Sequence, residues 1–135
     1  MRRAALLPAL LLGACVFAPS HGGPEIIRQP DGVNLVLEGA IAAAPGHHLV
    51  MGDLVLLANG AIPRHTHSGE EFLYVLGGSA TVMRDGEPDL VLRAGQGVRI
   101  PAGTVHGGKA GPEGTRAVSS WIVKDGAPLR TAASE

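Results

Sequence analysis

The stretch GAIPRHTHSGEEFLYVLGG at residues 60–78 carries the most specific pattern in this sequence. His65 and His67 are two positions apart, and Glu71 follows after a Ser-Gly pair at residues 68–69. Side chains two apart on a β-strand project from the same face, so both imidazoles can reach one ion. A turn at Ser-Gly can return the carboxylate to the same point. The stretch therefore predicts a metal site.

A second stretch, GQGVRIPAGTVH at residues 95–106, contains a further candidate ligand. Pro101 and Gly103 are typical turn residues, and they predict a reversal of the chain. The turn places His106 at the start of the next strand. Four ligands at these intervals are far more specific than an isolated pair of histidines, which is often a polar surface pair.

These two stretches resemble the two motifs of the cupin family, G-x5-H-x-H-x3-E-x6-G and G-x5-P-x-G-x2-H-x3-N. The resemblance spans about residues 59–110 and implies that the metal ligands are His65, His67, Glu71 and His106. Gly78, Gly95, Pro101 and Gly103 also fall in place. The sequence departs from the motifs at Asn59, where the leading glycine is one position late, and at Ala110, where the family has asparagine. Neither departure affects a ligand.

Short strands separated by turns are expected throughout, because twenty Gly and ten Pro leave little room for long helices. Apart from the histidine stretch, the expected strands are residues 33–38, 47–58, 72–76, 80–84, 90–93, 98–100 and 117–124, with the second either divided or bent at Gly52. The fold class is all-β. Together with the resemblance, this pattern predicts one cupin-type β-barrel, a double-stranded jelly roll, at residues 31–125, followed by a C-terminal tail at residues 126–135.

Alternation along residues 71–76 predicts which side chains face the site. Glu71, Leu73 and Val75 share one face, whereas Phe72, Tyr74 and Leu76 share the other. The nearby polar side chains are Glu70, Arg64, Tyr74 and Arg99, and none of them can be named as a catalytic base. His21, His47 and His48 are expected to lie outside the site.

Three neutral imidazoles and one carboxylate leave coordination positions open on a six-coordinate ion. Fe(II) or Mn(II) suits this donor set best, and Ni(II), Co(II), Cu(II) and Zn(II) are alternatives. The resemblance implies a metal-dependent dioxygenase similar to the quercetinase-like single-domain cupins, acting on a small organic substrate. Two alternatives remain open: an envelope protein that binds a small carboxylate or sugar through its metal without turnover, and an isomerase or epimerase.

The N-terminus resembles a bacterial export signal. Arg2 and Arg3 precede an apolar run at residues 4–12, which is too short to span a bilayer. The run ends in LGAC at residues 12–15, a pattern similar to the lipobox of lipoproteins, and Cys15 is the single cysteine of the chain. The alternative is cleavage after Ala18. We expect a signal peptide at residues 1–18, a tether at residues 19–30, and an exported protein that is either an envelope lipoprotein or periplasmic. Membrane attachment is expected through the signal or lipid alone.

The composition, with 45% hydrophobic and 17% charged residues, is that of a globular domain. The net charge of -1, without a basic cluster in the body of the chain, argues against a nucleic-acid partner. An aromatic content of 3% predicts an aliphatic core. Leu35, Leu37 and the apolar run at residues 54–57 exceed what such a small core buries, which predicts a homodimer.

Overall fold

The structure is a computed structural model that describes residues 29–134. The expected signal peptide, Cys15 and nearly all of the tether lie outside the described residues. Within the described part of the chain, no helix has the length and apolar character needed to cross a membrane.

Residues 29–134 form eight strands and no helix. The strands are β1 (Gly32–Ala40), β2 (His47–Leu56), β3 (Ala61–Thr66), β4 (Glu71–Arg84), β5 (Leu90–Arg93), β6 (Gly97–Ile100), β7 (His106–Lys124) and β8 (Thr131–Ala132). The expected all-β fold is confirmed. Two strands are longer than expected: the segments 72–76 and 80–84 join into β4, and β7 begins eleven residues before residue 117. The segment from 47 forms one strand, β2, which ends at Leu56.

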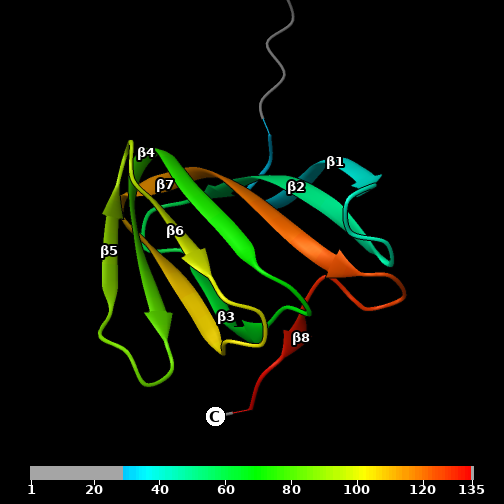
Figure 1. Cartoon of the computed structure of the whole chain (residues 1–135). Helices are drawn as coiled ribbons and strands as arrows, with labels where there is room; N and C mark the ends of the chain where they lie inside the picture. The colour runs from blue at the N-terminus through cyan, green and yellow to red at the C-terminus, as the bar shows by residue number, and fades with distance from the viewer. Residues whose placement is uncertain (1–28, 135) are drawn as a thin grey trace, which may run out of the picture.

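The long antiparallel pair of β4 and β7 forms the spine of the barrel (Figure 1). One half of β7 pairs with β2, and the other half pairs with β3. On its second edge, β4 pairs with β6 near its start and with β5 near its end. Strand β1 extends this sheet beyond β2, and β8 extends it beyond β3. Each of the two long strands therefore pairs with different short strands along its two halves.

The register of β4 against β7 shifts on either side of Gly77 and Gly78. Gly78 has a φ of 68°, and a Cβ there would lie 2.0 Å from the carbonyl oxygen of Gly114. Two backbones thus approach each other too closely for any side chain, and Gly114 also has a positive φ of 82°. The Gly-Gly pair is a bulge inside a continuous strand rather than the end of one.

The core is aliphatic apart from Trp121, as expected. Its main cluster is formed by Leu54, Leu73, Val75, Ala80, Val82, Leu92, Ile100 and Ala117, and a second cluster by Val50, Trp121 and Val123 with Leu129 packed against it. The alternation predicted for β4 is confirmed, since Leu73 and Val75 are buried whereas Phe72, Tyr74 and Leu76 are exposed. Residues two apart on this strand therefore define its inner face.

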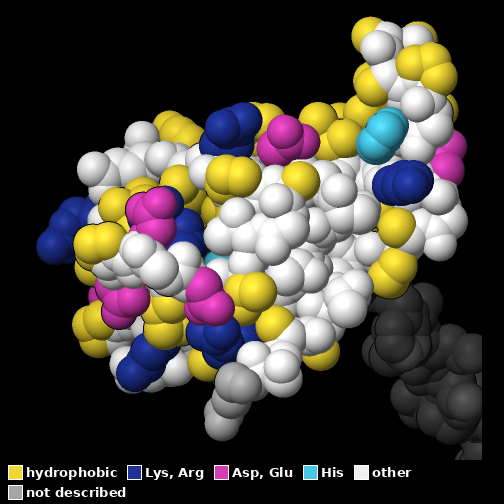
Figure 2. All heavy atoms as spheres, turned by 60° about the horizontal axis from the view of Figure 1, so that its bottom comes forward, with side chains coloured by type: hydrophobic (Ala, Val, Ile, Leu, Met, Phe, Trp, Pro, Cys, Tyr) yellow, Lys and Arg dark blue, Asp and Glu magenta, His cyan; other side chains and the backbone are white. Residues whose placement is uncertain are grey.

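Strand β1 is less covered than the other long strands, because it pairs with β2 alone. Leu35 is 57% exposed and Leu37 is 61% exposed, in agreement with the apolar excess expected from the sequence. Leu57 is exposed as well, but Leu54 is buried in the main core cluster. The excess apolar surface is thus smaller than the sequence indicates. On the face shown in Figure 2, basic and acidic side chains lie close together instead of forming a basic patch.

The segment assigned to a C-terminal tail contains a strand that the sequence did not predict. Strand β8 pairs with β3, placing Ala132 beside His65 and Thr131 beside Thr66. The amide of Ala133 also donates a hydrogen bond to the carbonyl of Arg64. Residues 131–133 consequently lie against the strand that carries the candidate ligand His65.

Candidate metal centre

The four predicted ligands come together inside the barrel. His65 is in β3, Glu71 begins β4 and His106 begins β7, while His67 follows β3 directly. All four side chains are buried, and one ligand atom from each lies within 4.8 Å of the others. Among residues 29–134, this is the one group of His, Cys, Asp or Glu side chains that has the spacing of a metal site.

Each imidazole is oriented by a backbone carbonyl. Nδ1 of His65 is 2.8 Å from the oxygen of Pro63, and Nδ1 of His106 is 2.8 Å from the oxygen of Thr104. Nδ1 of His67 is 2.5 Å from the oxygen of Leu129. A carbonyl accepts a hydrogen bond, so each Nδ1 carries the proton and each Nε2 is free to act as a ligand.

The spacing of the inward atoms fits a bound cation. The two Nε2 atoms of His65 and His67 are 3.1 Å apart. Oε2 of Glu71 is 3.0 Å from Nε2 of His106 and 3.2 Å from Nε2 of His67. Donors that lie about 2.1 Å from one ion, at right angles to each other, are about 3.0 Å apart. Lone pairs at this separation repel each other unless positive charge lies between them, so the residues present suit a divalent metal ion.

Glu71 keeps its negative charge in this buried setting. Burial opposes ionisation, but the contacts with His106 and His67, whose Nε2 atoms donate to the carboxylate when the rings are fully protonated, and the hydrogen bond from Ser119 outweigh it. They hold the pKa of Glu71 well below its usual range. Burial also acts on His106, yet the hydrogen bond to Glu71 leaves the pKa of that imidazole raised. Burial lowers the pKa of His65. The carboxylate therefore favours a positive charge beside it, whether a proton or a metal ion.

The turn between the ligands depends on Gly69. A Cβ at this position would lie 2.0 Å from the carbonyl oxygen of Ile122, in the neighbouring strand β7. On either side of the glycine, Ile122 donates its amide hydrogen to the carbonyl of Glu70, and Ser68 Oγ accepts a hydrogen bond from the amide of Lys124. The turn is thus pressed against β7, and this contact returns Glu71 to the two histidines.

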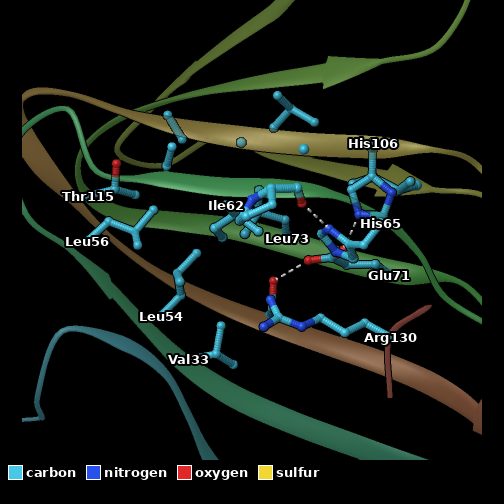
Figure 3. A pocket seen from close by; sticks show the side chains of 18 of the residues that line it. Val33, Leu54, Leu56, Ile62, His65, Glu71, Leu73, His106, Thr115 and Arg130 are labelled. Carbon is cyan, nitrogen blue, oxygen red and sulfur yellow. Dashed lines mark hydrogen bonds and ion pairs between the residues drawn. The ribbon is translucent and has the colours of Figure 1, made fainter. Parts of the chain in front are cut away.

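A cavity of about 510 Å³ opens beside the four ligands. Much of its lining is aliphatic and comes from Val33, Leu35, Leu54, Leu56, Leu73 and Val82. In Figure 3, His65, Glu71 and His106 gather at one end, and Leu56 and Thr115 lie toward the other. The volume accommodates a small organic molecule in contact with the metal site.

The other polar residues singled out near the motif do not line this cavity. Arg64 pairs with Asp85 through two contacts of 2.6 Å, and Tyr74 and Arg99 are exposed on the outer face. Glu70 uses its carbonyl to bind the amide of Ile122. His48 lies apart from the ligands, between Glu38 and Asp125, and His47 contacts the carbonyl of Pro45. His21 lies outside the described residues.

Three contributions to the site were missed from the sequence. Ser119 Oγ donates a hydrogen bond of 2.6 Å to Glu71, Leu129 supplies the carbonyl that orients His67, and Arg130 lines the cavity. The expected strand at 117–124 held a signal for Ser119, because alternation places it on the same face as Trp121. No pattern in residues 126–135 indicated that they reach the site.

Comparisons with known proteins agree with this fold. A family model described as "Cupin domain" matches residues 52–121. Among solved structures, an uncharacterized double-stranded β-helix protein from Klebsiella pneumoniae matches with a TM-score of 0.58 and 21% identity, over 82% of this chain and 91% of that one. A cupin-like protein from Thermotoga maritima matches with a TM-score of 0.59 and 18% identity, over 76% of this chain and 75% of that one.

Two kinds of enzyme share the fold at similarly low identity. Oxalate decarboxylase from Bacillus subtilis matches with a TM-score of 0.59 and 19% identity, over 78% of this chain and 29% of that one. A DMSP lyase from Ruegeria pomeroyi matches with a TM-score of 0.55 and 22% identity, over 67% of this chain and 44% of that one. The chain spans less than half the length of the DMSP lyases it matches. No curated protein sequence matches it significantly.

Proposed function

Because this chain belongs to the cupin family, we propose that it is a metal-dependent protein acting on a small organic molecule. Its buried ligands His65, His67, Glu71 and His106 would hold one divalent ion, with Fe(II) or Mn(II) expected first. The observation that carries the proposal is that all three imidazoles present Nε2, and Glu71 a carboxylate oxygen, to one point beside a cavity of about 510 Å³.

The reaction class we propose is oxidation by O2, as in a dioxygenase. The bound metal would supply the site at which O2 and substrate are activated. The chain itself orients the ligands and holds the charge of Glu71 through Ser119. The aliphatic part of its lining would contact the apolar part of the substrate. Because the metal would activate O2 and substrate and the chain would hold the ligands, this reaction requires no acid or base outside the ligand set.

Oxygen uptake tests the reaction class. Protein loaded anaerobically with Fe(II) or Mn(II) is mixed with small phenols, enols and carboxylates, and O2 consumption is followed with an electrode. We expect consumption that depends on both metal and substrate and that is lost in Glu71→Ala. Consumption that is equal in the wild type and the variant would contradict the role of this site.

A second candidate is binding of a small carboxylate through the metal without turnover. It is favoured by the lining, where Trp121 is the one large aromatic side chain and Lys109 and Arg130 are cationic. Planar aromatic substrates are usually held between aromatic side chains, which this cavity does not offer. Tight carboxylate binding by the metal-loaded protein, without O2 uptake or product, would identify this case.

An isomerase or epimerase receives less support. Such a reaction needs an acid and a base that face the substrate. Outside the ligand set, the carboxylate and amine that line the cavity belong to Asp31 and Lys109. Asp31 accepts a hydrogen bond from the amide of Leu57 at 3.0 Å, a contact that ties its carboxylate to the neighbouring backbone.

We also propose that the protein is exported and attached to the cell envelope through Cys15. Acyl chains on one cysteine give stable attachment once more than one chain is present. Metabolic labelling with a fatty acid should mark the wild type and fail to mark Cys15→Ser. Label retained in the variant, or wild-type protein found free in the periplasm, would favour cleavage after Ala18 instead.

A further inference from the structure

The charges that line the cavity favour an anionic ligand. Arg130 and Lys109 both line it, and neither takes part in any ion pair formed within residues 29–134. The acidic lining residues are Glu71, which faces the histidines, and Asp31, which binds a backbone amide. With a divalent ion bound, positive charges in the lining outnumber negative ones. An anion that enters the cavity is therefore stabilised electrostatically.

Arg130 is an exposed residue whose backbone is held by the residues on both sides of it. The carbonyl of Leu129 accepts the hydrogen bond from His67, and the Leu129 side chain packs against the core cluster that contains Trp121. On the other side, Thr131 pairs with Thr66 in the ladder between β8 and β3. One neighbour of Arg130 thus contacts a metal ligand directly, and the other is held in a strand.

The Arg130 side chain is directed across the cavity. In Figure 3 it extends from the C-terminal segment between Glu71 and Val33, that is, between the metal ligands and part of the apolar lining. A guanidinium group presents its N–H donors in a planar fork that matches the two oxygens of a carboxylate. A carboxylate bound there would leave the rest of its molecule among aliphatic side chains.

We propose that Arg130 is a specificity-determining residue that binds the carboxylate of a small organic acid whose apolar body occupies the cavity beside the metal ligands. The inference rests on the proposed function, because it assigns the substrate class of the same site. The guanidinium selects for the charged group, and the aliphatic walls select for the apolar body. A neutral molecule of the same shape then lacks the charged contact.

Binding of a matched acid and amide tests this inference. The metal-loaded full chain is titrated with 3-methylbutanoate and with 3-methylbutanamide, an aliphatic acid and amide that differ in charge but little in shape. The fluorescence of Trp121, the single tryptophan, reports binding. In Arg130→Ala we expect the affinity for the acid to fall about tenfold to hundredfold, since a hydrogen-bonded charge is lost. The affinity for the amide should stay unchanged, and Arg130→Lys should restore part of the preference for the acid.

Two further variants distinguish a specific contact with Arg130 from a general effect of positive charge. Arg99→Ala removes an exposed arginine outside the cavity and should leave both affinities unchanged. A loss of acid binding in Lys109→Ala but not in Arg130→Ala would overturn the assignment, as would a wild type that shows no preference for the acid over the amide. Equal loss of both probes in Arg130→Ala would indicate a structural role instead.

Metal content distinguishes this inference from the proposed function. The wild type and Arg130→Ala should contain the same amount of metal, because Arg130 is not a ligand. If the wild type binds no metal, the proposed function fails. If it binds metal and its preference for the acid over the amide does not depend on Arg130, the proposed function stands and the inference about Arg130 fails.

Discussion

The ligand region and strand β1 are both made of short antiparallel strands, yet their side chains are held in different ways. His65 lies on a strand with neighbours on both sides, β7 and β8, and a carbonyl orients its ring. Strand β1 pairs with β2 alone, contains a bulge between Leu35 and Leu37, and leaves both of these side chains largely exposed. The positions of side chains are thus closely constrained in the ligand region and loosely constrained in β1.

This difference explains why the spacing of a motif predicts how side chains are arranged, whereas hydrophobicity alone does not predict what covers them. Around the candidate ligands, a backbone carbonyl orients each imidazole and the side chain of Ser119 contacts Glu71, so residue type and interval closely constrain the geometry. Along β1, an apolar side chain can remain exposed at small cost, since much of any protein surface is apolar. Hydrophobic residues there do not by themselves reveal what covers them.

The largest expected effect distinguishes two glycines, one in each region. Gly69→Ala should destabilise the fold by more than about 2 kcal/mol, because its Cβ would lie 2.0 Å from a backbone oxygen of Ile122. Gly39→Ala, in β1, meets no atom within 4 Å and should be neutral or stabilise by up to about 1 kcal/mol. Urea denaturation measures both. Similar stability of the two variants would show that the turn at Gly69 is not constrained.

A smaller effect is expected for the serine that contacts Glu71. Ser119→Ala removes the hydrogen bond of 2.6 Å to the carboxylate and should weaken metal affinity by about tenfold, the usual cost of losing such a contact. Ser120→Ala is the matched control, because its side chain faces the opposite side of β7. Competition with a metal-sensitive dye measures the affinities. Equal affinity in the two variants would remove Ser119 from the site.

The smallest effect on the fold itself is expected at β1. We propose that a second copy of the chain covers the apolar surface of this strand in a symmetric homodimer. Leu37→Lys should convert the dimer into a folded monomer with unchanged metal content, whereas Val91→Lys, at an exposed position of β5, should leave the dimer intact. Light scattering on protein lacking residues 1–18 follows the mass. A wild type that is monomeric at high concentration would exclude the dimer.

The sequence predicted which four side chains come together at the candidate metal centre, and it predicted the inner face of β4, because both depend on local intervals. It did not predict the first half of β7, where Gly107, Gly108 and Pro112 resemble a loop although the segment pairs with β3 and β4. Strand β8 was missed for a related reason. Its position depends on pairing with β3, more than sixty residues away, and residues 126–135 carry no periodic pattern of their own.

The most direct test of the account is the metal content of protein purified without added metal chelators. Elemental analysis should find about one divalent transition metal ion per wild-type chain. His106→Ala should lose most of it, whereas His48→Ala, which removes a histidine between Glu38 and Asp125 away from the site, should retain it. Equal metal content in the wild type and His106→Ala would contradict the assigned centre. Metal that is absent from all three would contradict metal binding altogether.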